Sequence, residues 1–377
     1  VDSFSLLAVP FYILCGVLMN TGGIAQKLID FAKILVGRIP GGLAHTNILG
    51  NTLFGSLSGS SVAASVAIGG VLIPMEEKEG YDKKFAAAVN IASAPTGLII
   101  PPSGILIIYP VLAGCSVVGM IMSGYIPGLM WALACMVVAY VIAKKNHYPT
   151  AGKVSPSVFF KYFVDAIPSL LLIVIIVGGV MSGIFTATES AAVAVAYTLF
   201  LSIVVYRSIK IKDLPKILLD ACETTAVIMF LIAGSNVMSF VMSFTGLPSA
   251  IGNALISVSS NKYVILLIIN LVLLVVGCFM DITPAVLIFT PIFLPVVQSF
   301  GMDPIHFGIM MVMNLGIGNI TPPVGSALFS GCSVADMDME DMIKPILPFY
   351  AAIFVALMLV AYVPWFSMAL PTLFGAV

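Results

Sequence analysis

The sequence carries very little charge. Only 9% of its 377 residues are Asp, Glu, Lys or Arg, whereas 60% are hydrophobic. One soluble core cannot hide that much apolar surface, and the apolar runs reach the ~20 residues that span a bilayer. The formal net charge of −1 excludes the basic field that attracts nucleic acid. The composition therefore predicts an all-α integral membrane protein that lies in a lipid bilayer and binds no nucleic acid.

The sequence also lacks the residue patterns of a metal–thiol centre or an enzyme. Its six cysteines include no CxxC pair, and its three histidines show no HExxH spacing. No GxGD or GxSxG motif stands in a suitable helix, so a paired nucleophile and base is not expected. We therefore predict no catalytic residues, and an intramembrane enzyme or a structural scaffold subunit are the alternatives from other functional classes.

What the sequence does contain is a repeat at a fixed offset. Four glycines and prolines of the first half recur 221 positions later in the second half. They are Gly97, Pro101, Pro102 and Gly104, which recur as Gly318, Pro322, Pro323 and Gly325. Backbone-breaking residues at matching places in apolar sequence are typical of the duplicated halves of secondary transporters. Lysines are frequent in the loop 76–84 and absent from its counterpart 298–306. Since positive residues stay in the cytoplasm, corresponding loops face opposite sides and the repeat is predicted to be inverted.

Each repeat is expected to contain one re-entrant hairpin and one broken helix. The arms of the first hairpin, 44–57 and 62–73, are only roughly 20 Å long as helices, too short for a ~30 Å hydrocarbon core. Two amphipathic stretches, 23–38 and 247–262, suit helices along the interface. Symmetry also predicts a further helix pair before Val1. The predicted units are a first repeat at 1–145 (hairpin 44–74, broken helix 85–113), linker and scaffold helices at 146–215, and a second repeat at 216–377 (hairpin 264–295, broken helix 304–332).

The tandem prolines predict two cation sites. Proline has no N–H, so the carbonyl four residues before each proline loses its helical partner. An unsatisfied carbonyl in hydrocarbon costs several kcal/mol, so such backbone persists where it lines a cavity or binds something. Carbonyl and hydroxyl oxygens are ligands for a small hard cation. We predict one site between the tip 58–61 and the break 97–102, and one between the tip 281–283 and the break 318–323. A kink filled by neighbouring helices or water is the alternative.

The same breaks and tips create helix N-termini, whose free N–H groups and positive dipole ends favour an anionic substrate. Ordinary N-capping is the alternative for each candidate. Asp281 is the acidic residue expected at the depth of a hairpin tip, where cation coordination competes with tip capping and proton carriage. Glu189, which follows Thr186, is interpreted as a helix cap. The substrate-binding candidates are Ser60, Ser61, Ser103, Thr283, Gly325 and Ser326.

Several short motifs carry a family resemblance when they are taken in order along the chain. They are Gly41–His45, Ser58–Ser60, Leu72–Pro74, Glu79–Asp82, Ile99–Ser103, Gly183–Thr186 and Ile320–Gly325. Over essentially its whole length the sequence resembles the large, DctM-like membrane subunit of TRAP (tripartite ATP-independent periplasmic) transporters. The tip 58–61 looks similar to that of the sialic acid transporters of this family.

The resemblance implies a sodium-driven importer of an organic acid, with sialic acid as the predicted substrate, in a bacterial inner membrane. It implies an elevator movement, a small four-helix membrane subunit and a periplasmic substrate-binding protein as partners, and Na⁺ as the coupling ion. Proton coupling is the alternative, for which few carboxylates at membrane depth are available. The family likeness implies two sodium ions, each held by oxygens of one tip and one break. One ion is held by oxygens of Ser58, Ser60, Gly97, Ile100 and Pro102, and the other by oxygens of Asp281, Thr283, Gly318, Thr321 and Pro323.

Overall fold

The computed structural model describes residues 7–377 apart from 151–155, 247–249, 252–253, 255–256 and 258–260, and the regular secondary structure of these residues is entirely helical. The helical segments long and apolar enough to cross a membrane are Val117–Lys145, Phe159–Met181, Ala187–Val205, Ile211–Met242, Lys262–Phe279, Ile282–Ser299 and Met339–Tyr362. The predicted class, an all-α integral membrane protein, is confirmed.

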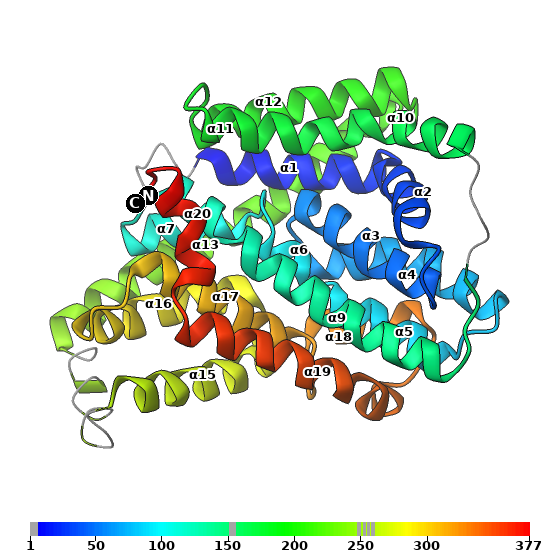
Figure 1. Cartoon of the computed structure of the whole chain (residues 1–377). Coiled ribbons are helices and arrows are strands. Elements are labelled where there is room, and N and C mark those ends of the chain that lie inside the picture. Colours follow the sequence, from blue (N-terminus) through cyan, green and yellow to red (C-terminus); the bar gives the residue numbers. More distant parts are fainter. Residues whose placement is uncertain (1–6, 151–155, 247–249, 252–253, 255–256, 258–260) are drawn as a thin grey trace.

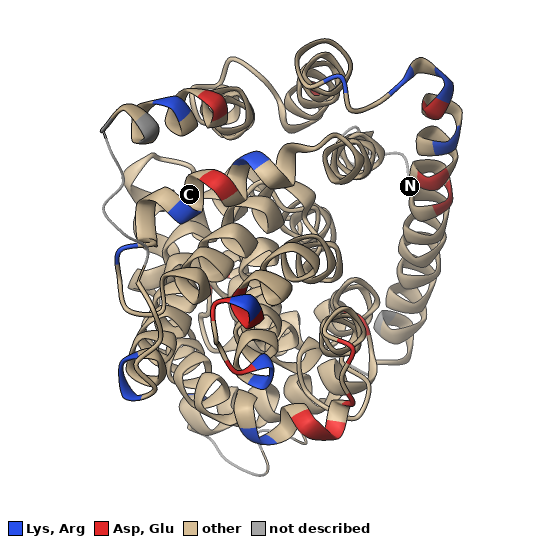
Figure 2. Cartoon of the chain, turned by 90° about the vertical axis from the view of Figure 1, so that its right-hand side faces the viewer, with Lys and Arg blue, Asp and Glu red and all other residues tan. Residues whose placement is uncertain are grey.

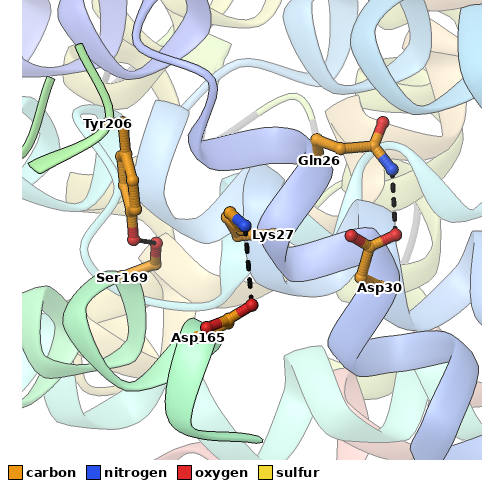
Figure 3. A network of polar contacts seen from close by, with 6 residues as sticks. All are labelled: Gln26, Lys27, Asp30, Asp165, Ser169 and Tyr206. Carbon is orange, nitrogen blue, oxygen red and sulfur yellow. Dashed lines mark hydrogen bonds and ion pairs between the residues drawn. The ribbon is translucent and has the colours of Figure 1, made fainter. Parts of the chain in front are cut away.

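The first two helices confirm the amphipathic stretch predicted at 23–38. Helix α1 (Ala8–Thr21) is followed after a bend of 71° by α2 (Ile24–Val36), whose residues Leu28 and Ile29 are buried. On its polar side, Lys27 Nζ lies 3.7 Å from Asp165 Oδ2 of α10 (Pro156–Ile173) (Figure 3). The second amphipathic stretch predicted, 247–262, lies largely outside the described residues.

The first hairpin forms where it was predicted, but its arms are longer. Helix α3 (Gly42–Ser58) has 17 residues and α4 (Ser61–Lys78) has 18. The expected end of α4 near Pro74 was wrong, because an internal proline removes one helical hydrogen bond without ending the helix. Gly59, in the left-handed region (φ 63°), ends α3, and the Ser60 hydroxyl caps α4 by accepting a hydrogen bond from Ala63 N–H (3.2 Å).

The second hairpin consists of α15 (Lys262–Phe279) and α16 (Ile282–Ser299), and the chain reverses between them at Met280 and Asp281. In Figure 1, α15 and α16 lie on the left and α3 and α4 on the right. The two hairpins therefore approach the centre of the molecule from opposite ends.

The two segments predicted as broken helices are each divided into shorter helices in the structure. The first consists of α5 (Lys83–Ser93), α6 (Thr96–Ile99) and α7 (Ile105–Ala113), and the second of α17 (Pro304–Asn319) and α18 (Ser326–Val334). The peptide bonds Pro101-Pro102 and Pro322-Pro323 within the two breaks are cis. The indole of Trp131, which is fully buried, donates a hydrogen bond to the carbonyl of Ala92 near the end of α5 (2.9 Å). Neighbouring helices thus satisfy part of the backbone that the first break exposes.

The remaining helices surround these elements, and α10, α12 and α1 pack along one side (Figure 1). The sequence did not predict α20. These helices are α8 (Val117–Ser123), α9 (Tyr125–Lys145), η2 (Val174–Gly178), α11 (Gly179–Met181), α12 (Ala187–Phe200), η3 (Leu201–Val205), η4 (Ile211–Asp213), α13 (Leu214–Thr245), α19 (Met339–Tyr362) and α20 (Trp365–Leu373).

Charged residues are sparse and lie mainly at helix ends and turns on the side shown in Figure 2. One ion pair there joins the start of the first broken helix to α19. Lys84 Nζ donates a hydrogen bond to Asp341 Oδ1 (2.6 Å), which raises the pKa of the exposed Lys84 ammonium. This pair connects the two repeats at the surface.

Candidate functional site

A cavity of about 520 Å³ lies where the two hairpin tips meet the first helix break. Helices α1 and α13 close its other sides, with Tyr12 and Asn20 from α1 and Asp220 and Thr224 from α13. The structure therefore brings six of the fourteen candidate residues, drawn from both repeats, to one space. Those lining it are Ser58, Ser60, Ser61, Pro102, Asp281 and Thr283.

The polar lining consists of hydroxyl, amide, carboxylate and backbone groups. Two carboxylates, Asp220 and Asp281, line the cavity, and no Lys, Arg or His does so among the residues that the structure describes. An anion in this cavity would bind through hydroxyls, the amide of Asn20 and N–H groups at helix starts such as that of α4. A cation, by contrast, finds oxygen ligands from both hairpin tips.

The first helix break lies against the first hairpin through two glycines. A Cβ atom added to Gly97 would lie 2.2 Å from the Cα of Gly55 in α3, so the two backbones are in direct contact. The tip itself lies against α1, because a Cβ atom on Gly16 would lie 2.9 Å from the carbonyl oxygen of Ser58. This close packing brings the hairpin backbone beside the break as the predicted first cation site requires.

The second break repeats this arrangement. A Cβ atom added to Gly318 would lie 2.5 Å from the Cα of Gly277 in α15. The carbonyl of Cys278 accepts hydrogen bonds from the N–H groups of Val324 (3.2 Å) and Gly325 (3.3 Å). The two repeats therefore place a glycine of the hairpin against a glycine of the break in the same way.

Several backbone carbonyls around the second pair of prolines already accept hydrogen bonds. The Gly318 carbonyl accepts a hydrogen bond from Thr321 N–H (2.9 Å), and the Thr321 hydroxyl donates to Ile317 (2.7 Å). The Tyr350 hydroxyl donates to the carbonyl of Ile320. The N–H of Ile320, which follows the end of α17, is also directed to the Gly318 carbonyl, so N–H groups of the break itself satisfy this oxygen.

The other candidates do not line the cavity. Ser103 is fully buried, and its hydroxyl has no hydrogen-bond partner among the described residues. Gly97 and Ile100 are buried behind the first tip, whereas Pro323 is exposed and Thr321 half-buried. The two remaining residues, Gly325 and Ser326, begin α18, and the Ser326 hydroxyl lies 3.0 Å from Asp281 Oδ1.

The two acidic residues singled out in the sequence have different surroundings. Asp281 is exposed where it faces the cavity and makes no hydrogen bond that caps α16. Glu189 forms a capping box with Thr186, since its carboxylate accepts the Thr186 N–H (2.8 Å) and its own N–H donates to the Thr186 hydroxyl (3.2 Å). The interpretation of Glu189 as a helix cap is confirmed.

Sequence reasoning missed a buried polar group in the first hairpin. Glu76 is fully buried, and its Oε2 accepts a long hydrogen bond from Asn47 Nδ2 (3.5 Å). Asn51 Nδ2 in turn donates to Asn47 Oδ1 (2.8 Å) and to Asn90 Oδ1 (3.0 Å). The spacing of Asn47 and Asn51 on one helix face was the available signal, whereas Glu76 stands next to exposed charges that suggested a loop.

Another missed residue is Asn319, at the end of α17. Its side-chain Nδ2 donates to Ser61 Oγ (2.8 Å) although the two residues are 258 positions apart. Its Oδ1 accepts a hydrogen bond from the Ser326 hydroxyl. The sequence analysis implied only its main-chain carbonyl, which lies four residues before Pro323, and not its side chain.

An all-α membrane fold in which two hairpin tips and a helix break line one polar cavity is typical of a membrane transport protein. Residues 1–366 match the family described as tripartite ATP-independent periplasmic transporter, DctM component. The chain belongs to this family of large permease subunits. It is therefore a multi-pass protein of a bacterial inner membrane and a transporter subunit, not an enzyme.

Three relatives illustrate the range of the family. The chain is 52% identical to a Salmonella typhimurium protein titled uncharacterized protein YgiK, over 99% of this chain and 86% of that protein. It is 40% identical to the sialic acid TRAP transporter large permease protein SiaM of Vibrio cholerae, over 99% and 88% of the two chains. It is 39% identical to the C4-dicarboxylate TRAP transporter large permease protein DctM of Pseudomonas aeruginosa, over the same shares. The substrates named for these relatives differ.

Proposed function

We propose that this chain is the transport subunit of a sodium-coupled importer of an organic acid. The observation that carries the proposal is the single cavity lined by both hairpin tips and the first break, with Ser58, Ser60, Pro102 and Asp281 on its walls. Oxygens from both repeats suit a small cation, and hydroxyls with a helix N-terminus suit a carboxylate. A cation also offsets the charge of Asp281 when an anion enters.

Sialic acid is the substrate that we propose. Its support is the resemblance of the tip 58–61 and the 40% identity to SiaM of Vibrio cholerae. The 39% identity to a C4-dicarboxylate permease gives the competing substrate nearly equal weight. An uptake assay in which the two acids compete distinguishes these two candidate substrates.

The proposed partners are a small four-helix membrane subunit and a periplasmic protein that delivers the substrate. The proposed movement is an elevator, in which hairpins and broken helices travel as one body against a scaffold. The glycine contacts Gly55–Gly97 and Gly277–Gly318 support this proposal, because they join each hairpin to its break without intervening side chains. Such contacts favour motion as a unit.

Proton coupling is the second candidate, and one observation favours it. Glu76 is a fully buried carboxyl group with no basic partner among the described residues. It does not line the cavity, however, so it is remote from the proposed substrate. Sodium coupling therefore remains the preferred proposal.

The test is uptake into proteoliposomes that contain this chain and its two partners. Imposed sodium and proton gradients are applied separately, with labelled sialic acid as substrate and unlabelled sialic acid or succinate as competitor. We expect uptake that requires an inward sodium gradient, is competed by sialic acid, and is lost in Pro102→Ala. Uptake driven by a proton gradient in the absence of sodium contradicts sodium coupling. Uptake of labelled succinate without any uptake of labelled sialic acid contradicts the proposed substrate.

A further inference from the structure

A chain of hydrogen bonds joins the two hairpin tips through one buried amide. Asn319, only 1% exposed, donates from Nδ2 to Ser61 Oγ (2.8 Å) at the start of α4. Its Oδ1 accepts from Ala327 N–H (3.3 Å) and from the Ser326 hydroxyl. The Ser326 hydroxyl also lies 3.0 Å from Asp281 Oδ1 at the second tip. The chain therefore runs from the first tip to the second through side chains of the second break.

The orientation of the Asn319 amide is fixed by its surroundings. A backbone N–H such as that of Ala327 can only donate, so the amide oxygen has to face it. The amide nitrogen is then directed to Ser61, whose hydroxyl accepts. If Asn319 turned over, its NH2 group would face the Ala327 N–H, two donors against each other, so the observed orientation is favoured.

The Ser326 hydroxyl stands between two acceptors. A hydroxyl donates one hydrogen, whereas both Asn319 Oδ1 and Asp281 Oδ1 lie within reach. A bare carboxylate is the stronger acceptor, since hydrogen bonds to charged groups are stronger than those to neutral ones. A cation bound to Asp281 makes its carboxylate a weaker hydrogen-bond acceptor. The Ser326 hydroxyl then donates its hydrogen to Asn319 Oδ1. The hydrogen-bond chain thus responds to charge at the second tip.

The internal repeat shows that packing alone does not require this amide. The offset of 221 relates Asn319 to Leu98 and Ser61 to Ile282. Both of these apolar residues line the central cavity. The positions related by the repeat to the hydrogen-bonded pair Asn319 and Ser61 therefore hold two apolar residues, and each of the two pairs takes one residue from each repeat.

We infer that Asn319 is a positioning residue that couples cation binding at the second hairpin tip to the geometry of the first. The inference rests on the proposed sodium-coupled transport. When a cation occupies Asp281, Ser326 donates to Asn319, and the fixed amide holds Ser61 and the N-terminus of α4 at the cavity. The two sites then bind sodium cooperatively.

The experiment measures uptake in proteoliposomes of the complete transporter as a function of sodium concentration, for wild type, Asn319→Leu, Ser61→Ala and the double variant. Leucine copies the residue of the other repeat, and Ser61→Ala removes one hydroxyl, so at least one variant is expected to fold. The control is Asn314→Leu, which removes another buried amide of α17, bonded to Asn270 (2.7 Å) and not to either tip. A double-mutant cycle measures whether two residues act through each other.

We expect the Hill coefficient for sodium to fall from ~2 in the wild type to ~1 in Asn319→Leu and in Ser61→Ala, because it is limited by the number of coupled sites. The double variant is expected to show no further change, and Asn314→Leu to keep the wild-type coefficient. Retention of the wild-type coefficient in both single variants, or an equal fall in Asn314→Leu, overturns the inference alone. Wild-type uptake that ignores sodium overturns the proposed function and the inference together.

Discussion

The glycine contacts between each hairpin and its helix break give the sharpest prediction. A Cβ atom at Gly97 would lie 2.2 Å from the Cα of Gly55, against the ~3.5–4.0 Å of an unstrained carbon pair, so α3 and α6 would have to separate by roughly 1.3 Å. Overpacking costs about 1–3 kcal/mol, and the upper end applies where neither backbone can turn aside. We expect Gly97→Ala to lose about 3 kcal/mol of stability on this scale.

The distances also predict a rank order for the four glycines. The closest approach of the added Cβ atom is 2.2 Å at Gly97, 2.5 Å at Gly318, 2.8 Å at Gly55 and 3.1 Å at Gly277. The loss of stability on substitution by alanine is expected to decrease in that order. Because the same displacement moves oxygens of the proposed cation sites, the sodium concentration for half-maximal uptake is expected to rise in the same order.

The assay is the apparent melting temperature of the purified protein in detergent at one scan rate, together with uptake at varied sodium. Gly70→Ala in α4 is the matched control, because its Cβ atom would meet only Val334, at an ordinary 3.9 Å. Alanine is a better helix former than glycine, so this variant is expected to be as stable as the wild type or slightly more so. If Gly97→Ala melts and transports like Gly70→Ala, the argument from backbone contact is refuted.

Substitutions at three further positions test other parts of the account. In Glu76→Gln the side chain still accepts the hydrogen bond from Asn47, so we expect wild-type yield. In Glu76→Leu the Nδ2 of Asn47 loses its acceptor, and we expect a loss of about 1–3 kcal/mol of stability. Equal melting temperatures of the two variants would contradict this. Thr186→Ala removes the capping box with Glu189 and is expected to cost ~1 kcal/mol while sodium dependence stays unchanged; altered sodium dependence would give these residues a role beyond capping. Asp281→Asn keeps the shape but removes the charge, and the half-maximal sodium concentration is expected to rise roughly tenfold, the effect of ~1.4 kcal/mol; an unchanged value would exclude the carboxylate as a cation ligand.

The backbone-breaking residues made the membrane architecture predictable. Proline and glycine act locally, so Pro101-Pro102 and Pro322-Pro323 located both helix breaks, and Gly59 located the first hairpin tip. The amphipathic pattern of α2 was equally local. Helix lengths were less predictable, since Pro74 did not end α4, where tertiary packing outweighs a single lost hydrogen bond.

The side-chain environment of the site was only partly predictable. The sequence located both hairpin tips but assigned them to separate sites, and it did not predict that Ser60, Ser61 and Asp281 line one cavity. The roles of Asn319 and Glu76 depend on contacts across 258 and 29 positions of sequence, which no local pattern reports. Polar residues that act through long-range partners therefore need the structure.

The central claim is that oxygens gathered at the two helix breaks bind sodium. The most direct measurement is a high-resolution density map of the complete transporter in sodium, compared with one in choline. We expect two sodium-dependent peaks, one among oxygens of Ser58, Gly97 and Pro102, and one among those of the second tip, Gly318 and Thr321. Maps in which neither position changes with sodium, or in which the sodium-dependent density lies elsewhere, would contradict the account.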